Sequence, residues 1–236
     1  MNASLRWQDG KVGYYSPGNV AKSFPVEQKG DGFRVWQNGK QLMGIKVRPL
    51  ASGSLAGVLE ITPDRFGDDR GYFIEIYNRG SFQEHGIGQD FVQDNQSLSR
   101  DTGTVRGLHF QIPPFAQAKL IRVLKGAVFD VAVDIRRGSP SFGQHVSRKL
   151  TAERGNQLFI PEGFAHGICT LQRDTEVLYK VSAGYSPAND RGILWNDPDL
   201  GISWPVDAAD AILSEKDKRQ PKLKDCQDGF VYHTTP

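Results

Sequence analysis

The hydrophobic and polar positions of the chain alternate in short runs from about Val58 onward. Turns rich in Gly, Pro, Asn and Asp separate these runs at spacings typical of a β-sandwich or a β-barrel. The clearest run spans residues 128–135, where every second residue from Phe129 to Ile135 is apolar and the other face carries two acids. This pattern predicts a protein that is mainly β.

Two further strands carry a polar group on an otherwise apolar face. Residues 119–124 and 176–181 alternate in the same way, which places Lys119 and Tyr179 among Val and Ile positions. Taken alone, each has an ordinary interpretation, because a Lys stem often lies on apolar surface and a Tyr often lies in a core. Together they are candidates for a site inside the barrel.

Signals for helices are few. Residues 80–85 predict one or two turns, and a short helix is expected where Ser214 can act as its N-cap. Residues 1–42 show little clean alternation, and the strand pattern follows from Met43 onward. We expect an N-terminal extension of unknown role over residues 1–42 and one β-domain over residues 43–236.

Composition and charge narrow the classes of function. The 29 Lys and Arg residues nearly balance the 27 Asp and Glu residues, so the net charge of +2 does not favour a nucleic-acid or membrane surface. Cys169 and Cys226 form no CxxC pair, which suits a reducing compartment. No apolar stretch resembles a signal peptide or approaches the roughly 20 residues of a membrane span. We expect a cytoplasmic protein that binds neither nucleic acid nor membrane.

Two blocks resemble the motifs that bind metal in cupin barrels. The block that ends at His166 fits G-x5-P-x-G-x2-H, and His109 takes the first His position of the other motif. In that motif Gln111 replaces the second His and Lys119 replaces the Glu. A divalent metal needs several neutral imidazoles or carboxylates, and an ammonium group repels it. The resemblance therefore predicts a cupin double-stranded β-helix, or jelly-roll barrel, with a few short helices and no metal.

The remaining polar groups suit proton transfer beside a carbonyl. One imidazole can remove a proton bound to carbon, and the Lys119 cation can stabilise the enolate oxygen that results. The Tyr179 phenol can return a proton as the acid. A soluble enzyme that acts on a carbonyl compound is thus one prediction from the residues themselves.

Seven blocks between about Gly57 and Lys218 resemble the dTDP-4-dehydrorhamnose 3,5-epimerase family. They are FGDDRGYF (66–73), FVQDN (91–95), RGLHFQ (106–111), FDVAVDIR (129–136), IPEGFAHG (160–167), LWNDP (194–198) and LSEKD (213–217). The resemblance implies epimerisation at C3 and C5 of dTDP-4-dehydro-6-deoxy-D-glucose to dTDP-4-dehydro-L-rhamnose, without a cofactor. It also implies a homodimer that exchanges an N-terminal strand.

The resemblance assigns the catalytic roles. It implies that His109 is the base, that Asp217 orients its imidazole, and that Tyr179 is the acid on the opposite face of the sugar ring. It places Lys119 and His166 around the keto oxygen of the sugar.

Further residues follow from the same resemblance. Asp130 is expected to pair with His166 or with nearby groups. Tyr185 is expected to stack on the nucleobase of the substrate. The positions implied to hold the diphosphate and thymine are Arg70, Phe73, Glu75, Gln93, Asn95 and Arg106. Of these, Arg70 and Glu75 are candidates to serve the site of the partner subunit, and the two arginines have surface ion pairing as their alternative role.

Other functions stay open at this point. A related cupin could invert one centre alone, or isomerise the ketone between C3 and C4 of the same nucleotide sugars. A cupin that only binds a nucleotide sugar has no need of His109, Asp217 or Tyr179, and all three are present. Gln111 and Lys119 disfavour a metal-dependent oxygenase. The remaining histidines match no motif and are interpreted as ordinary surface or turn residues: His85, His145 and His233.

Overall fold

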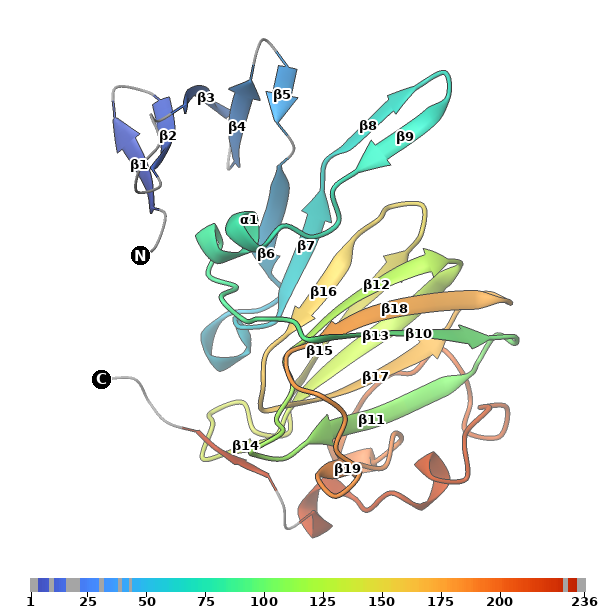
Figure 1. Cartoon of the computed structure of the whole chain (residues 1–236). Helices are drawn as coiled ribbons and strands as arrows, with labels where there is room; N and C mark the ends of the chain where they lie inside the picture. The colour runs from blue at the N-terminus through green and yellow to red at the C-terminus, as the bar shows by residue number, and fades with distance from the viewer. Residues whose placement is uncertain are drawn as a thin grey trace. The chain divides into compact units, whose positions relative to one another are not determined.

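A computed structural model describes residues 4–8, 11–15, 22–29, 32–37, 40–42, 44–226 and 229–232 (Figure 1). The chain divides into two compact units. One comprises Met1–Lys46 and Pro63–Ile87, and the other comprises Val47–Thr62 and Gly88–Pro236.

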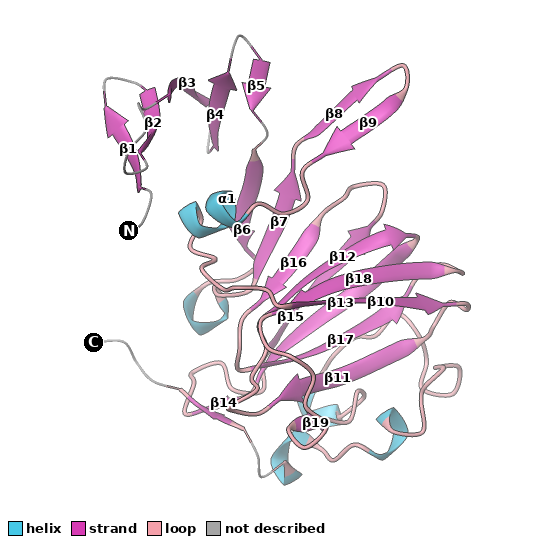
Figure 2. Ribbon diagram, viewed as in Figure 1, coloured by secondary structure: helices cyan, strands magenta, loops and turns pink. Residues whose placement is uncertain are grey.

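The elements are nearly all strands, and helix is confined to short segments (Figure 2). In chain order the strands are β1 (Ser4–Gln8), β2 (Lys11–Tyr15), β3 (Lys22–Lys29), β4 (Gly32–Gln37), β5 (Lys40–Leu42), β6 (Ile45–Pro49), β7 (Leu59–Pro63), β8 (Arg65–Asp68), β9 (Gly71–Ile74), β10 (Gln93–Ser99), β11 (Val105–Gln111), β12 (Lys119–Lys125), β13 (Ala127–Asp134), β14 (Arg136–Arg137), β15 (His145–Thr151), β16 (Gln157–Ile160), β17 (Phe164–Thr170), β18 (Thr175–Val181), β19 (Asp190–Gly192) and β20 (Phe230–Val231). The helices are α1 (Arg79–Glu84) and the 3-10 turns η1 (Gly53–Leu55), η2 (Pro198–Leu200), η3 (Asp217–Arg219) and η4 (Leu223–Asp225). No helix within the described residues has the length and apolar character needed to cross a membrane.

The first unit contains strands that the sequence pattern did not predict. Its first five strands form an antiparallel sheet in the order β1-β2-β3-β4-β5. The sequence places Asp-Gly between β1 and β2 and Asn-Gly between β4 and β5, and these dipeptides favour tight hairpins. The unit also holds the β8–β9 hairpin and α1, the helix expected near residues 80–85, with Asn78 as its N-cap.

The second unit is the predicted jelly-roll barrel. One sheet has the strand order β10-β18-β12-β16-β7-β6, and the other has the order β15-β13-β17-β11-β19. Strands β12, β13 and β18 lie where the alternation predicted them. The apolar positions of β12 and β18 are buried between the sheets. The apolar face of β13 with Val131, Val133 and Ile135 instead packs on the outer side of its sheet, and the face that carries the two acids lies inside. Ile121 and Val177 from the first sheet share one core cluster with Val128 and Ile168 from the second, so the two inner faces pack on each other.

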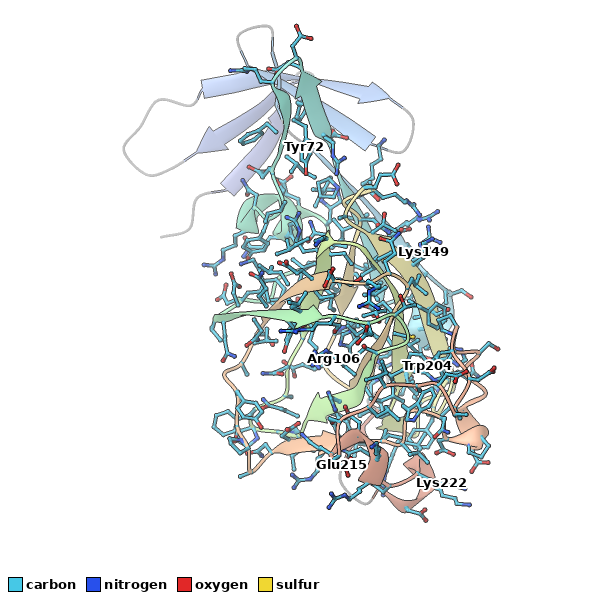
Figure 3. All side chains as sticks on the ribbon, turned by 90° about the vertical axis from the view of Figure 1, so that its right-hand side faces the viewer. Tyr72, Arg106, Lys149, Trp204, Glu215 and Lys222 are labelled. Carbon is cyan, nitrogen blue, oxygen red and sulfur yellow. The ribbon has the colours of Figure 1, made fainter. Side chains whose placement is uncertain are left out.

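The C-terminal segment covers the outer face of the second sheet. Leu108, Val131 and Ala165 form a cluster there with Ile193 and Leu200. Trp204, labelled in Figure 3, belongs to the same cover. Its ring meets Phe129 edge-on with centroids 5.9 Å apart, and its indole donates to the Trp195 carbonyl at 2.8 Å. This segment then runs beside the start of β11, where Ile212 exchanges main-chain hydrogen bonds with Gly103 and Val105, and it brings Asp217 to His109.

A chain that starts at Met43 is expected to remain folded and to keep its activity. Among the described strands, β1 to β5 pair only with one another, so their removal breaks no ladder of the barrel. Thermal unfolding and an activity assay on the truncated chain check this. Aggregation, or loss of activity with an intact barrel, would show that the first sheet is part of the working enzyme.

Candidate active site

Polar side chains gather at one end of the inner face of the first sheet. On its strands, Asn95 is paired with Tyr179, and Lys119 and Gln93 are both paired with Val181. Residues paired in this way share a face of the sheet, so four polar groups lie beside an apolar core. Lys119 is only 8% exposed.

A β-bulge in β11 supplies the groups on the facing sheet. Arg106 is paired with Ile168, and His109 is paired with His166, so three steps along β11 match two along β17. The extra residue keeps both Arg106 and His109 on the inner face, where a regular strand would put them on opposite faces. Gly107 makes the bulge possible, because it has a φ of +123° and a Cβ there would lie 2.6 Å from the His166 carbonyl oxygen.

The His109 imidazole is anchored by a carboxylate from the C-terminal segment. Its Nε2 lies 2.5 Å from Oδ1 of Asp217, and the other oxygen of Asp217 accepts from the Ser214 hydroxyl at 2.8 Å. Burial opposes ionisation of Asp217, but the hydrogen bonds from His109 and Ser214 outweigh it and lower the pKa of the carboxyl. The Asp217 amide donates back to the Ser214 hydroxyl, but the helix at this place is a single 3-10 turn, η3, whose N-cap is Lys216 and not Ser214 as predicted.

A second His–carboxylate pair lies deeper in the barrel. His166 Nε2 is 2.9 Å from Oδ1 of Asp130, whose side chain is fully buried. Burial raises the pKa of Asp130, although His166 and Lys119 both favour its charged form. The contact holds His166 in place beside its strand partner His109.

Lys119 brings a cation to the metal position of the cupin motif. Its Nζ donates to the His109 carbonyl at 3.2 Å. Burial lowers the pKa of Lys119 to about 8, while Asp190 and Asp130 favour the charged form. Among the described residues, no group of three or more His, Cys, Asp or Glu side chains could hold a metal ion.

Tyr179 lies on the same sheet as Lys119, across the cavity from His109 on the other sheet. Burial raises the pKa of the Tyr179 phenol, Arg106 lowers it, and Asp190 raises it further, with a net rise. The phenol is therefore protonated at neutral pH, as an acid requires. Arg106 is held by hydrogen bonds from its guanidinium to the Ser99 hydroxyl at 3.1 Å and to the Leu98 carbonyl at 3.2 Å.

These groups surround a cavity of about 260 Å³ within the second unit. Six of the predicted site residues line it: Gln93, Asn95, His109, Lys119, Tyr179 and Tyr185. Five residues that sequence reasoning did not assign also line it: Phe110, Gln111, Gln117, Asp190 and Lys216. Four other predicted site residues are absent from this lining: Arg106, Asp130, His166 and Asp217. Asp217 contacts the lining residue His109, His166 is the strand partner of His109, and Asp130 contacts His166.

Asp190 and Lys216 form an ion pair at the cavity wall. Asp190 also accepts from the Tyr185 hydroxyl at 3.2 Å. Lys216 directly precedes Asp217 in the LSEKD block, and that position was the one signal for it in the sequence. Asp190 begins the three-residue strand β19, which is too short to show an alternation.

The three predicted binding residues nearest the N-terminus belong to the other unit. Arg70 forms an ion pair with Asp68 at 2.5 Å in the β8–β9 hairpin, and Phe73 on β9 is 63% exposed. Glu75 accepts from the Asn78 side chain at 3.3 Å. These residues are absent from the lining of the barrel cavity among the described side chains.

The histidines without a motif do not contribute to the cavity lining either. His85 ends α1, where its Nδ1 lies 2.7 Å from the Ser81 carbonyl oxygen, and His145 begins β15. His233 lies outside the described residues.

The barrel and its site define a cupin-type isomerase, with an anchored imidazole, a buried cation and a protonated phenol around one cavity. The family model for dTDP-4-dehydrorhamnose 3,5-epimerase matches residues 52–225. The chain therefore belongs to the dTDP-4-dehydrorhamnose 3,5-epimerase family, as the sequence blocks predicted.

Individual members of the family are similar to this chain in sequence and in structure. The chain is 52% identical over 179 residues to the dTDP-4-dehydrorhamnose 3,5-epimerase of Sinorhizobium fredii, covering 76% of this chain and 91% of the relative. The crystal structure of the Bacillus anthracis enzyme with TDP and pyrophosphate bound is 47% identical, with a TM-score of 0.72 over 76% of this chain and 99% of that one. The crystal structure of the Legionella pneumophila enzyme in complex with dTDP-4-keto-L-rhamnose is 38% identical, with a TM-score of 0.74 over 80% of this chain and 100% of that one.

The alkaline limb of the pH profile is expected to report Lys119. Its ammonium form is present below a pKa of about 8 and is lost as the pH rises through that value, so kcat/KM should fall above about pH 8. The Tyr179 phenol keeps its proton in this range because its pKa is raised. In Lys119→Arg the limb should move to higher pH, since a guanidinium stays charged. An alkaline limb at the same pH in Lys119→Arg and in the wild type would contradict the assignment of this limb to Lys119.

Proposed function

We propose that the chain inverts C3 and C5 of dTDP-4-dehydro-6-deoxy-D-glucose and gives dTDP-4-dehydro-L-rhamnose. The observation that carries this proposal is the placement of His109 and Tyr179 on facing sheets around one cavity, which Lys119 also lines from the sheet of Tyr179. A base on one side of a sugar ring and an acid on the other are what an inversion by proton transfer requires.

The proposed steps move one proton off carbon and another onto it. His109 removes the proton from a carbon beside the C4 ketone, and the Asp217 carboxylate stabilises the imidazolium that forms. The negative charge passes to the C4 oxygen, where the Lys119 ammonium and His166 stabilise the enolate. Tyr179 then gives its proton to the opposite face of the carbon. Exchange with solvent returns a proton to Tyr179 and removes the one on His109, and the second carbon follows in the same way.

The nucleotide is proposed to extend from the same cavity. Gln93, Asn95 and Tyr185 line the cavity together with Tyr179. Arg106 is outside the lining of this cavity but lies on the same inner face of β11 as His109, and its guanidinium fork matches phosphate oxygens. The ion pair of Lys216 with Asp190 adds a second cation at this wall. These contacts support binding of a nucleotide sugar.

The proposal also covers the remaining binding residues, the partner subunit, residues 1–42 and the location in the cell. Arg70, Phe73 and Glu75 are proposed to contact the nucleotide, with Arg70 and Glu75 serving a partner subunit in a homodimer that exchanges an N-terminal strand. Residues 1–42 are proposed to be an extension that precedes the epimerase domain, and a cytoplasmic location is expected.

Replacing the base is expected to separate catalysis from folding. His109→Asn should lose at least ~10³-fold in kcat, the scale of a general base with its positioning. Asp217→Asn should lose less, because the imidazole remains and only its orientation and basicity change. Turnover assays together with unfolding midpoints check both variants. Turnover of His109→Asn near that of the wild type would assign the base to another residue.

Solvent deuterium should appear at both C3 and C5. Each inversion removes a carbon-bound proton and returns one from a group that exchanges with solvent, so every inverted carbon acquires a label. Incubation with the 4-keto nucleotide sugar in deuterated water, followed by reduction, mass spectrometry and proton NMR, counts and locates the labels. Label at one carbon alone means a mono-epimerase, and label at neither carbon means a protein that only binds the sugar.

A further inference from the structure

Glutamine side chains hold the loop that carries Tyr185. We call residues 183–186 the Tyr185 loop; it lies between β18 and β19. Gln117 donates to the Ala183 carbonyl at 2.7 Å, and the Tyr185 amide donates to Gln93 Oε1 at 3.1 Å. The Tyr185 side chain is 61% exposed and lines the cavity, so the loop places an aromatic ring at its mouth.

Gln111 makes the largest share of these contacts. Its Nε2 donates to the Gly184 carbonyl at 3.1 Å and to the Phe115 carbonyl at 2.7 Å. Its Oε1 accepts from the Ser186 amide at 2.7 Å. One side chain therefore ties the Tyr185 loop at two points to the segment that follows β11.

Only a carboxamide satisfies this set of partners. Two of the partners are carbonyl oxygens and need donors, while the third is an N–H group and needs an acceptor. A carboxylate at this position offers no donor, and an apolar side chain offers neither. Gln111 is only 3% exposed, so water does not readily replace the lost hydrogen bonds.

The same contacts explain why Gln111 lines the cavity and still takes no part in proton transfer. It lies two residues after His109 on β11, at the position where metal-binding cupins have a second His. Both of its donor hydrogens are directed to main-chain carbonyls, and its oxygen accepts from the backbone. The side chain acts on the wall of the cavity rather than on the reacting carbons.

We propose that Gln111 is a positioning residue that fixes the Tyr185 loop, and with it the ring of Tyr185 against the nucleobase of the substrate. The inference rests on the proposed function for the identity of the ligand, a deoxythymidine diphosphate sugar. The proposal predicts that loss of the Gln111 contacts weakens binding of the nucleotide more than it slows proton transfer.

The test measures the affinity for dTDP by calorimetry, with kcat and KM for the 4-keto nucleotide sugar. Gln111→Glu keeps the size of the side chain and its acceptor but removes both donors, and the dissociation constant for dTDP should rise by about tenfold or more. KM should rise with it, and kcat should change less. Gln117→Glu is the matched control, since it adds the same charge to the same wall and removes a single hydrogen bond; its effect should be smaller.

A double-mutant cycle identifies the residue through which Gln111 acts. Gln111→Met removes all three hydrogen bonds without adding a charge, and Tyr185→Ala removes the ring. In the Tyr185→Ala background, Gln111→Met should weaken dTDP binding by less than threefold, because the ring that it positions is already gone. Additive losses in the cycle, or an equal effect of Gln117→Glu and Gln111→Glu, would overturn the proposal.

The outcomes separate this proposal from the proposed function. A wild-type protein that binds dTDP without turning over the sugar contradicts the epimerase function. The double-mutant cycle can still be measured in that case, because it uses only the affinity for dTDP. Normal wild-type turnover with additive losses contradicts the role of Gln111 alone. Unfolding midpoints accompany each variant, and if Gln111→Met does not fold, the isosteric Gln111→Glu is combined with Tyr185→Ala in its place.

Discussion

The close approach of β11 to β17 at Gly107 is the constraint on which the site depends. A Cβ at this residue would lie 2.6 Å from the Gly167 Cα and from the His166 carbonyl oxygen, so the bulge requires glycine. Through the bulge, one strand presents Arg106 and His109 to the interior while Leu108 and Phe110 still enter the core on the outer face. The base, the guanidinium and the contact with His166 thus follow from one extra residue in one strand.

The interior charges compensate one another around a buried ammonium. Lys119 loses hydration in the barrel, which lowers its pKa to about 8, and Asp130 and Asp190 recover part of that loss. Asp130 in turn is shared with His166, whose strand partner is His109. A cation that is fixed by the fold stabilises an enolate without reorganisation at the moment of reaction, which is the advantage of a preorganised site.

The regular strands of the barrel could largely be predicted from the sequence. Site residues in irregular segments could not. Alternation located Lys119 and Tyr179 on apolar faces, and the cupin-like spacing located His109 and His166, because strands and tight turns fix side-chain direction locally. Asp190 and Gln117 lie where no period exists, and only the fold brings them to the cavity. Asp217 lies 108 residues from His109 and was found through the resemblance of its block. The first five strands were missed although their Asp-Gly and Asn-Gly dipeptides are hairpin signals, because residues 1–42 show little clean alternation of apolar and polar positions.

In the proposed mechanism, the two sheets of the barrel also determine the stereochemical outcome. Stacked sheets lie roughly 10 Å apart and their side chains fill most of that space, so the room for a sugar ring is the cavity of about 260 Å³ at one end of the sheets. His109 and its anchor Asp217 belong to one side of that space, and Tyr179 projects from the other. A proton removed by His109 leaves one face of the ring, and a proton from Tyr179 arrives on the other. Retention would require both transfers on one side, so a ring held between these two groups is inverted at each carbon that His109 can reach.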